Sequence, residues 1–74
     1  MNHNIMLVIK LGEAIKNRRK ELKITQPHLA ELAQISVNTL YKLEKGDGNP
    51  SIDVLNKLAE VLGMEISFEV KKKP

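Results

Sequence analysis

Apolar residues recur at steps of three and four along most of the chain, and this spacing predicts four amphipathic helices. The predicted helices cover about Leu7 to Leu22, Gln26 to Ala33, Val37 to Lys45, and Ile52 to Leu62. Helices this short cannot bury an apolar stripe alone, so we expect them to pack together around one core. The core positions that the spacing predicts are Leu7, Leu11, Ala14, Ile15, Leu22, Leu29, Leu32, Ala33, Val37, Leu40, Leu43, Ile52, Leu55, Leu58, Ala59 and Leu62.

Residues suited to helix ends lie at the boundaries of these stretches. Thr25, Ser36 and Ser51 each precede a helical pattern, where a hydroxyl oxygen can accept a hydrogen bond from an otherwise unpaired backbone N–H. Gly63 can close the fourth helix in a left-handed conformation. Lys23 is expected to take that conformation after the first helix, at some cost in stability, because it is not a glycine.

Two further stretches favour pairing between extended segments. Met64 to Val70 alternates apolar and polar residues, a pattern that predicts a strand. A lone strand lacks hydrogen-bond partners, so its partner should be the same strand of a second subunit or a segment near Ile5 to Ile9, which itself could be helix or strand. We interpret residues 64–70 as a dimerisation strand, with either Ile66 and Phe68 or Met64 and Val70 covering the fourth helix, and residues 71–74 as a basic tail.

Composition narrows the class of protein. The chain has 74 residues, enough for one small domain, and no cysteine, so disulfides and thiolate metal sites are excluded and the cytoplasm is the expected compartment. No apolar run approaches the roughly 18 to 20 residues of a membrane span. Residues 1–45 carry eight Lys/Arg and four Glu, whereas residues 46–70 carry one Lys and five Asp/Glu. The basic half favours an anionic partner such as nucleic acid, although solubility alone would also explain the charges.

Several motifs resemble those of a known family. They are L-G-E-A-I-K-N-R-R-K-E-L-K-I-T-Q, L-A-E-L-A-Q-I-S, L-Y-K-L-E-K-G, N-P-S and L-N-K-L-A-E-V-L-G. Over about residues 10 to 63 the chain resembles the helix-turn-helix domains of lambda-repressor/Cro-like, or XRE, regulators. With the strand that follows, it resembles HipB-type antitoxins, which are small dimers that bind operator DNA and a HipA-like kinase toxin.

The resemblance implies an all-α fold. It would be a lambda-repressor-like DNA-binding domain of four or five helices over residues 1–63, with the short C-terminal strand pairing across a dimer. The resemblance also implies a buried ion pair between Arg19 and Glu44; two solvated charges are the alternative. The turn glycines common in the family are Lys23 and Gln34 here, which affects the rigidity of the turns more than the fold.

In a helix-turn-helix the second helix enters the major groove of DNA. This geometry makes the outward-facing residues of the third predicted helix the candidates for base reading. Asn38 can pair with an adenine edge, Lys42 can donate to guanine, and Val37 can touch a thymine methyl group, although Val37 could equally be a core contact. Tyr41 could reach a phosphate or cover the helix surface. The base-reading candidates are therefore Val37, Asn38, Tyr41 and Lys42.

A second set of residues is expected to hold the DNA backbone. The family resemblance gives Gln26 a phosphate contact and a role in bracing the recognition helix. Ser36 and Thr39 have hydroxyls that suit phosphate, although a capping role would also explain Ser36. Lys45 and Asn49 can clamp the flanking phosphates. The phosphate-binding candidates are Gln26, Ser36, Thr39, Lys45 and Asn49.

These residues predict a repressor that binds double-stranded DNA as a homodimer on palindromic operators. By resemblance it would be the antitoxin of a toxin–antitoxin system that regulates its own operon. The alternative is a phage-type repressor or a restriction-modification control protein without a toxin partner. An enzyme is not expected, because His3 and His28 have neither a carboxylate pair nor a phosphate loop nor metal-ligand spacing beside them. We expect no cofactor and no metal.

Overall fold

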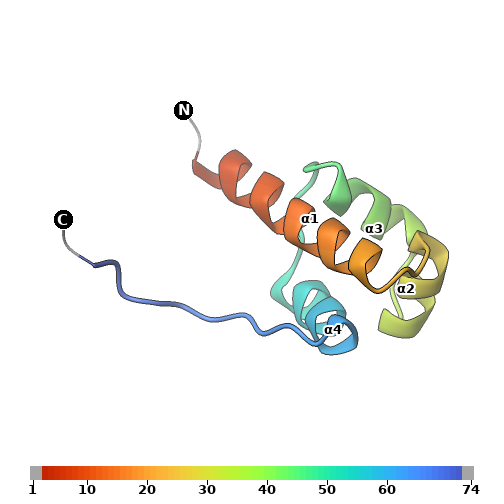
Figure 1. The fold of residues 1–74 in the computed structure, drawn as a ribbon. Coiled ribbons are helices and arrows are strands. Elements are labelled where there is room, and N and C mark those ends of the chain that lie inside the picture. The colour runs from red at the N-terminus through yellow and green to blue at the C-terminus, as the bar shows by residue number, and fades with distance from the viewer. Residues whose placement is uncertain (1–2, 73–74) are drawn as a thin grey trace.

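Four helices account for the folded part of the chain. The computed structural model describes residues 3–72, and Figure 1 shows α1 (His3–Glu21), α2 (Gln26–Ala33), α3 (Val37–Glu44) and α4 (Ile52–Leu62). The long helix α1 packs against α3 and α4, and α2 packs against the same two helices from another side. None of the helices in residues 3–72 has both the length and the apolar character needed to cross a bilayer. The predicted all-helical architecture is confirmed.

The first helix begins earlier than its periodicity predicted. It starts at His3 instead of near Leu7, so Ile5 to Ile9 form helix, and the strand alternative for this stretch is wrong. The backbone groups of Ile5 to Ile9 lie within a helix, so they are not available for pairing with the C-terminal segment, which we define as residues 64–72. The beginning of α1 projects beyond the other helices (Figure 1).

Leucines from three helices form the centre of the core. Leu29, Leu40, Leu43, Leu58 and Leu62 are almost fully buried, and they pack in one cluster with Ile15, Ala30, Ala33 and Leu55. Burying a leucine side chain contributes about 1.5–3 kcal/mol, so this cluster dominates the stability of the fold.

The prediction of the core was wrong at several positions. Six residues expected inside are exposed, namely Leu7, Ala14, Leu22, Leu32, Val37 and Ile52, whereas Val8 and Ala30 are buried and were not predicted. These positions share the apolar periodicity of their helices, but they lie at the edges of the stripe or beyond the reach of a neighbouring helix. Periodicity indicates which face is apolar and not how far the neighbouring helices extend over it.

The predicted capping residues are confirmed. Ser36 Oγ accepts from Thr39 N at 3.0 Å and Ser51 Oγ accepts from Val54 N at 3.1 Å, while Gly63 has φ 68° at the end of α4. Lys23 has φ 58°, the left-handed conformation expected of it. Each of these contacts satisfies or positions backbone groups that a helix end leaves unpaired.

Helices α1 and α3 approach each other closely at Gly12. A Cβ atom at this position would clash with the backbone carbonyl oxygen of Leu43. Only glycine leaves room for that backbone, so Gly12 sets the distance between α1 and α3. Glycine lowers helix propensity by about 1 kcal/mol relative to alanine, which close packing must offset here.

The C-terminal segment forms neither helix nor strand in this chain. It leaves the end of α4, borders hollows beside α1 as far as Phe68, and then extends beyond the helices (Figure 1). The predicted strand over Met64 to Val70 is therefore absent from the described residues of a single chain. The physical reason is that a strand needs a hydrogen-bonded neighbour, and the described part of the chain supplies none.

Candidate nucleic-acid interface

Helices α2 and α3 are joined by a tight turn that holds them as one unit. Gln34 ends α2 with φ 59°, and its backbone N–H donates to Glu31 O at 3.1 Å. The next N–H, on Ile35, donates to Ala30 O at 3.0 Å. Ser36 then begins α3, so only Gln34 and Ile35 separate the end of α2 from the capping residue of α3. These local bonds fix the angle between the helices without the glycine common in such turns.

The outer face of α3 carries the four candidate base-reading side chains. Val37 is 46% exposed and Tyr41 is 48% exposed, and Asn38 and Lys42 are exposed beside them. The opposite face is buried through Leu40, Leu43 and Glu44. Because positions separated by four residues share a helix face, the four exposed residues form one continuous stripe. The alternative role of Val37 as a core contact is wrong.

Hydroxyl groups gather at the beginning of α3. Ser36 Oγ lies 2.7 Å from Thr39 Oγ1, and it also accepts from the backbone N–H of Thr39. Both residues are exposed. The capping role of Ser36 is therefore present in the structure, and the two hydroxyls remain at the surface where a phosphate could reach them.

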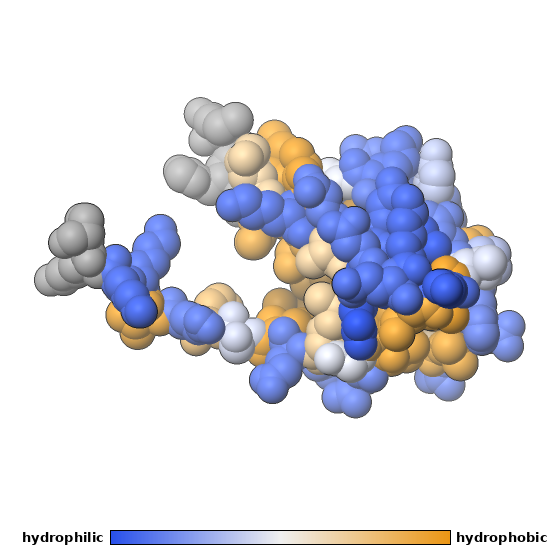
Figure 2. All heavy atoms as spheres, viewed as in Figure 1, coloured by the Kyte–Doolittle hydropathy of each residue, from blue (hydrophilic) through white to orange (hydrophobic). Residues whose placement is uncertain are grey.

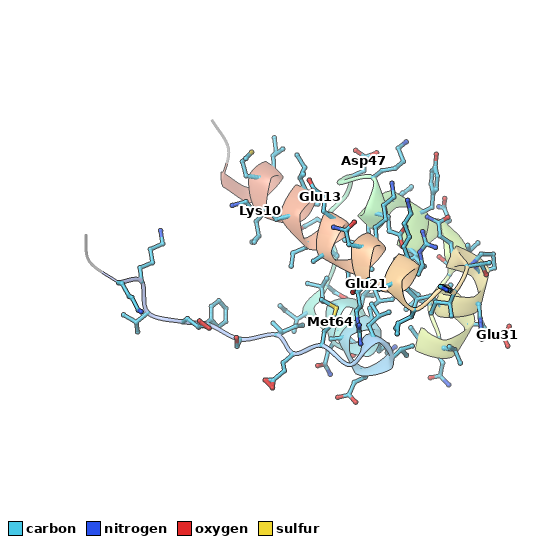
Figure 3. The ribbon with its side chains drawn as sticks, viewed as in Figure 1. Lys10, Glu13, Glu21, Glu31, Asp47 and Met64 are labelled. Atoms are coloured by element: carbon cyan, nitrogen blue, oxygen red, sulfur yellow. The ribbon has the colours of Figure 1, made fainter. Side chains whose placement is uncertain are left out.

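The end of α3 carries a lysine with two neighbours. Lys45 Nζ lies 5.1 Å from the centre of the Tyr41 ring and 3.7 Å from Asp47 Oδ2. Figure 3 labels Asp47 in the loop after α3. The contacts hold the ammonium group near the base-reading stripe, but a phosphate bound there would have to compete with the Asp47 carboxylate.

A shallow hollow connects the stripe with the loop that follows α3. It has a volume of about 130 Å³, and its walls include Thr39, Lys42, Asp47 and Asn49. The structure therefore brings together two candidate phosphate ligands, Thr39 and Asn49, and one candidate base reader, Lys42. The sequence did not indicate that Asp47 would share this hollow.

A buried carboxylate connects three parts of the helix pair and its scaffold. Arg19 Nε donates to Glu44 Oε2 at 2.8 Å and Arg19 Nη2 donates to Glu44 Oε1 at 2.9 Å, a bidentate pair between α1 and α3. Gln26 Nε2 also donates to Glu44 Oε1, at 3.0 Å, from the beginning of α2. Arg19 Nη1 donates to Ile24 O at 2.9 Å. This network holds the end of α3 against α1 and α2.

The network shifts the titration of both charged partners. Burial acts to raise the pKa of Glu44, but hydrogen bonds from Arg19 and Gln26, together with the charge of Arg19, outweigh it and hold that pKa below its ordinary value. The hydrogen bond to Glu44 raises the pKa of Arg19. Both groups are therefore charged in the folded protein near neutral pH, and the ion pair is formed.

Gln26 combines a structural contact with a possible ligand contact. One N–H of its side-chain amide is used by Glu44, and the amide carries a second N–H that could donate to a phosphate. The family resemblance gave Gln26 a role in bracing the recognition helix, and its bond to Glu44 of α3 is a contact of that kind. No local signal pointed to Glu44 as the partner, because the two residues meet only through the tertiary fold.

A family comparison covers the whole of this site. A model of the helix-turn-helix family HTH_3 matches residues 15–68. The immunity repressor protein of Bacillus phage phi105 is 42% identical to the chain over 57 residues, which are 77% of this chain and 40% of the repressor.

Two further relatives come from other sources. The cryptic phage CTXphi transcriptional repressor of Vibrio cholerae serotype O1 is 34% identical over 58 residues, which are 78% of this chain and 52% of that protein. An uncharacterized HTH-type transcriptional regulator of Methanothermobacter thermautotrophicus is 41% identical over 51 residues, which are 69% of this chain and 74% of that protein. The chain spans about half or less of the length of each of the two phage repressors. With this match over the helix pair and its scaffold, the chain belongs to the HTH_3 helix-turn-helix family.

Proposed function

We propose that this protein is a sequence-specific DNA-binding transcriptional repressor that acts as a dimer on palindromic operator DNA. The observation that carries the proposal is the exposed stripe on α3, formed by Val37, Asn38, Tyr41 and Lys42. An α-helix fits the major groove, where an asparagine can pair with adenine and a lysine with guanine. The two phage relatives are named as repressors, which supports regulation of transcription as the role.

Backbone contacts would surround this stripe. Ser36, Thr39, Lys45 and Asn49 are exposed near either end of α3, and Gln26 keeps one amide N–H beyond its bond to Glu44. Such contacts orient the protein on the duplex and carry no sequence information themselves. In this arrangement Asn38 and Lys42 discriminate between bases, while the surrounding residues supply affinity.

Dimerisation would supply the affinity that one small domain lacks. A single DNA-binding module buries only about 600–1,000 Å² of protein surface, so two half-sites about one helical turn apart are the usual solution. The alternating apolar residues of Met64, Ile66, Phe68 and Val70 are the pairing element of this proposal. Removal of residues 64–74 should give a monomer that binds DNA weakly, and sedimentation that shows an intact dimer after the deletion would count against this element.

The proposal is tested by selecting bound duplexes from a random pool with the purified chain. The expected result is an inverted repeat whose half-sites are about one helical turn apart, bound with an affinity that falls steeply as salt rises. A pool that shows no enriched sequence, at a salt concentration where the chain binds duplex DNA, would contradict sequence-specific recognition.

A second candidate function is that of an antitoxin of the HipB type, with a HipA-like kinase toxin as partner and with autoregulation of the operon. The observation that favours it is the exposed C-terminal segment, in which the apolar Ile66, Phe68 and Val70 alternate with polar residues that include Glu65 and Glu69. This segment lies mostly within the acidic part of the chain, residues 46–70. Such a segment suits a protein partner. Co-expression with a kinase from the adjacent gene tests it: a stable complex supports an antitoxin, and its absence favours a phage-type repressor or a restriction-modification control protein.

A further inference from the structure

An apolar groove lies between the beginning of α1, the beginning of α4 and the C-terminal segment. It has a volume of about 270 Å³, and Leu7, Leu11, Pro50, Ile52, Leu55 and Phe68 form much of its wall. Figure 2 shows hydrophobic atoms on both sides of the gap between α1 and the C-terminal segment. The groove lies on a different part of the chain from the α3 stripe, so DNA recognition does not account for it.

Large apolar side chains around this groove are exposed to water. Leu7 is 56% exposed, Ile52 is 68% exposed and Phe68 is fully exposed. The C-terminal segment is anchored where it leaves α4. Met64 N donates to Ala59 O at 2.9 Å, and Met64 is half-buried beside α1 and α4 (Figure 3). The even-numbered face of the segment therefore already begins to pack on the helices. Exposed apolar patches of this kind are typical of surfaces that bind a partner or a ligand.

The segment itself restricts what the partner can be. Its apolar residues occupy even positions from Met64 to Val70, and its odd positions from Glu65 to Lys71 are polar. Two copies of the segment can pair in antiparallel fashion around a two-fold axis. The residue numbers of every opposing pair then add up to the same sum, which defines the register. Only an even sum places apolar residues opposite apolar residues on one face of the ribbon.

Charge and apolar pairing together select one register among the even sums. With Phe68 on the axis, Ile66 faces Val70 and each Glu65 faces a Lys71, so two ion pairs form between glutamate and lysine. This register also gives every residue from Met64 to Lys72 an opposing residue, and only the outermost pair, Met64 with Lys72, places an apolar residue opposite a charge.

The neighbouring registers are less favourable. With Ser67 on the axis, Glu65 faces Glu69 twice, and with Glu69 on the axis that residue faces its own copy. Like charges directly opposite each other are destabilising. With Ile66 on the axis, Val70 would face Leu62, which belongs to α4 and is not available for a ladder. With Val70 on the axis, Glu69 would face Lys71, but Phe68 would face the charged Lys72.

We propose that a second copy of this chain covers the groove. The two C-terminal segments pair in antiparallel register with Phe68 opposite Phe68, and the apolar face of the resulting ribbon packs on Leu7 and Ile52 of the two subunits. This inference rests on the dimer of the proposed function and specifies its register and its docking surface. Complementarity between Glu65 and Lys71 is what identifies the occupant as a second copy.

The register is tested by disulfide cross-linking, for which the chain is well suited because it has no cysteine of its own. Three single variants of the full chain, Ser67→Cys, Phe68→Cys and Glu69→Cys, are oxidised under mild conditions, with the exposed Glu31→Cys on α2 as the control for random collision. Only a residue on the axis has a Cα separation from its copy within the bonding range of about 4.4–6.8 Å, since diagonal neighbours are about 7–8 Å apart.

The expected result is that Phe68→Cys forms the dimer at least ten times faster than the other variants. Faster cross-linking at position 67 or 69 would overturn the register. Rates at all three positions equal to that of Glu31→Cys would overturn the pairing of the segments. Retained binding of the selected duplex in either case would leave the proposed DNA-binding function in place.

A charge exchange tests the same register without removing Phe68. Lys71→Glu places two pairs of like charges opposite each other and should raise the dimer dissociation constant about 5- to 30-fold in sedimentation equilibrium. Adding Glu65→Lys should return the constant to within about threefold of the unmodified chain. A double variant that dimerises no better than Lys71→Glu would contradict the opposition of these residues. DNA binding by the unmodified chain is measured separately, so failure of the proposed function would appear there.

Discussion

The carboxylate of Glu44 offers a direct way to test how the recognition helix is held. Replacing Glu44 with alanine removes the acceptor of three hydrogen bonds, two from Arg19 and one from Gln26. The Arg19 side chain, which is only 12% exposed, then keeps its charge in a site with no carboxylate opposite. Gln26 is half-buried and can turn to water, so most of the cost should arise at Arg19.

The size of the effect follows from this burial. Removal of one partner from a buried ion pair costs about 3–5 kcal/mol, whereas an exposed pair contributes about 0–1 kcal/mol. At about 0.05–0.15 kcal/mol per residue, a chain of this length is stable by about 4–11 kcal/mol in total. Glu44→Ala should therefore remove a large part of the stability, and the end of α3 should loosen before the rest of the core.

Urea unfolding, followed by circular dichroism at neutral pH and one protein concentration, measures this loss. A control variant, Arg19→Met with Glu44→Leu, replaces both charges with apolar groups and should recover most of the free energy of unfolding. A decrease below about 1 kcal/mol for Glu44→Ala would refute the claim that the pair is buried and bonded in solution. Equal losses in the single and double variants would show that packing, and not the unpaired charge, causes the effect.

Three other predictions follow from the same structure. The native pKa of Glu44 lies below its ordinary value of about 4.3, so the ion pair stabilises the fold fully above that pH. This stabilisation is lost as the pH falls through the lower native pKa. When the free energy of unfolding is measured against pH, its decrease in acid should therefore be smaller for Glu44→Gln than for the unmodified chain. Gly12→Ala should destabilise the fold by about 1–3 kcal/mol in thermal or urea unfolding, because its Cβ meets the Leu43 carbonyl oxygen. Lys45→Ala should weaken binding to all duplexes similarly and reduce the slope of log affinity against log salt by about one unit.

Each of these predictions has a result that would contradict it. Identical acid titrations of the unmodified and Glu44→Gln chains would remove the native pKa shift as a source of stability. The matched control for Gly12 is Asn17→Ala, also on α1 but exposed, and equal effects of the two substitutions would rule out a steric cause. An unchanged salt slope for Lys45→Ala would mean that Asp47 keeps the lysine from phosphate.

The helices could be predicted from the sequence because local signals mark them. Thr25, Ser36 and Ser51 stand where caps are needed, and apolar residues between them recur with the helical period. The exposed stripe on α3 could be predicted for the same reason, since a helix that buries Leu40 and Leu43 must present Asn38 and Lys42 outward.

Other features depend on contacts between distant residues and could not be read locally. Gln26 meets Glu44 only because α2 and α3 fold onto α1, and Arg19 meets Glu44 for the same reason. Gly12 did leave a signal, because a glycine inside a predicted helix usually needs a packing reason. The strand predicted over Met64 to Val70 failed in the single chain because alternation describes the faces of a segment and does not provide the partner that its backbone needs.

The most direct test of sequence recognition by α3 compares Asn38→Ala with the unmodified chain on two DNA duplexes. One is the duplex selected from the random pool and the other is a scrambled duplex of the same length, both measured at one salt concentration. If Asn38 reads a base edge, the variant should bind the selected duplex about 5- to 150-fold less tightly per half-site and the scrambled duplex about as well as before. Equal losses on both duplexes would contradict base reading by Asn38 and the account of α3 as the recognition helix.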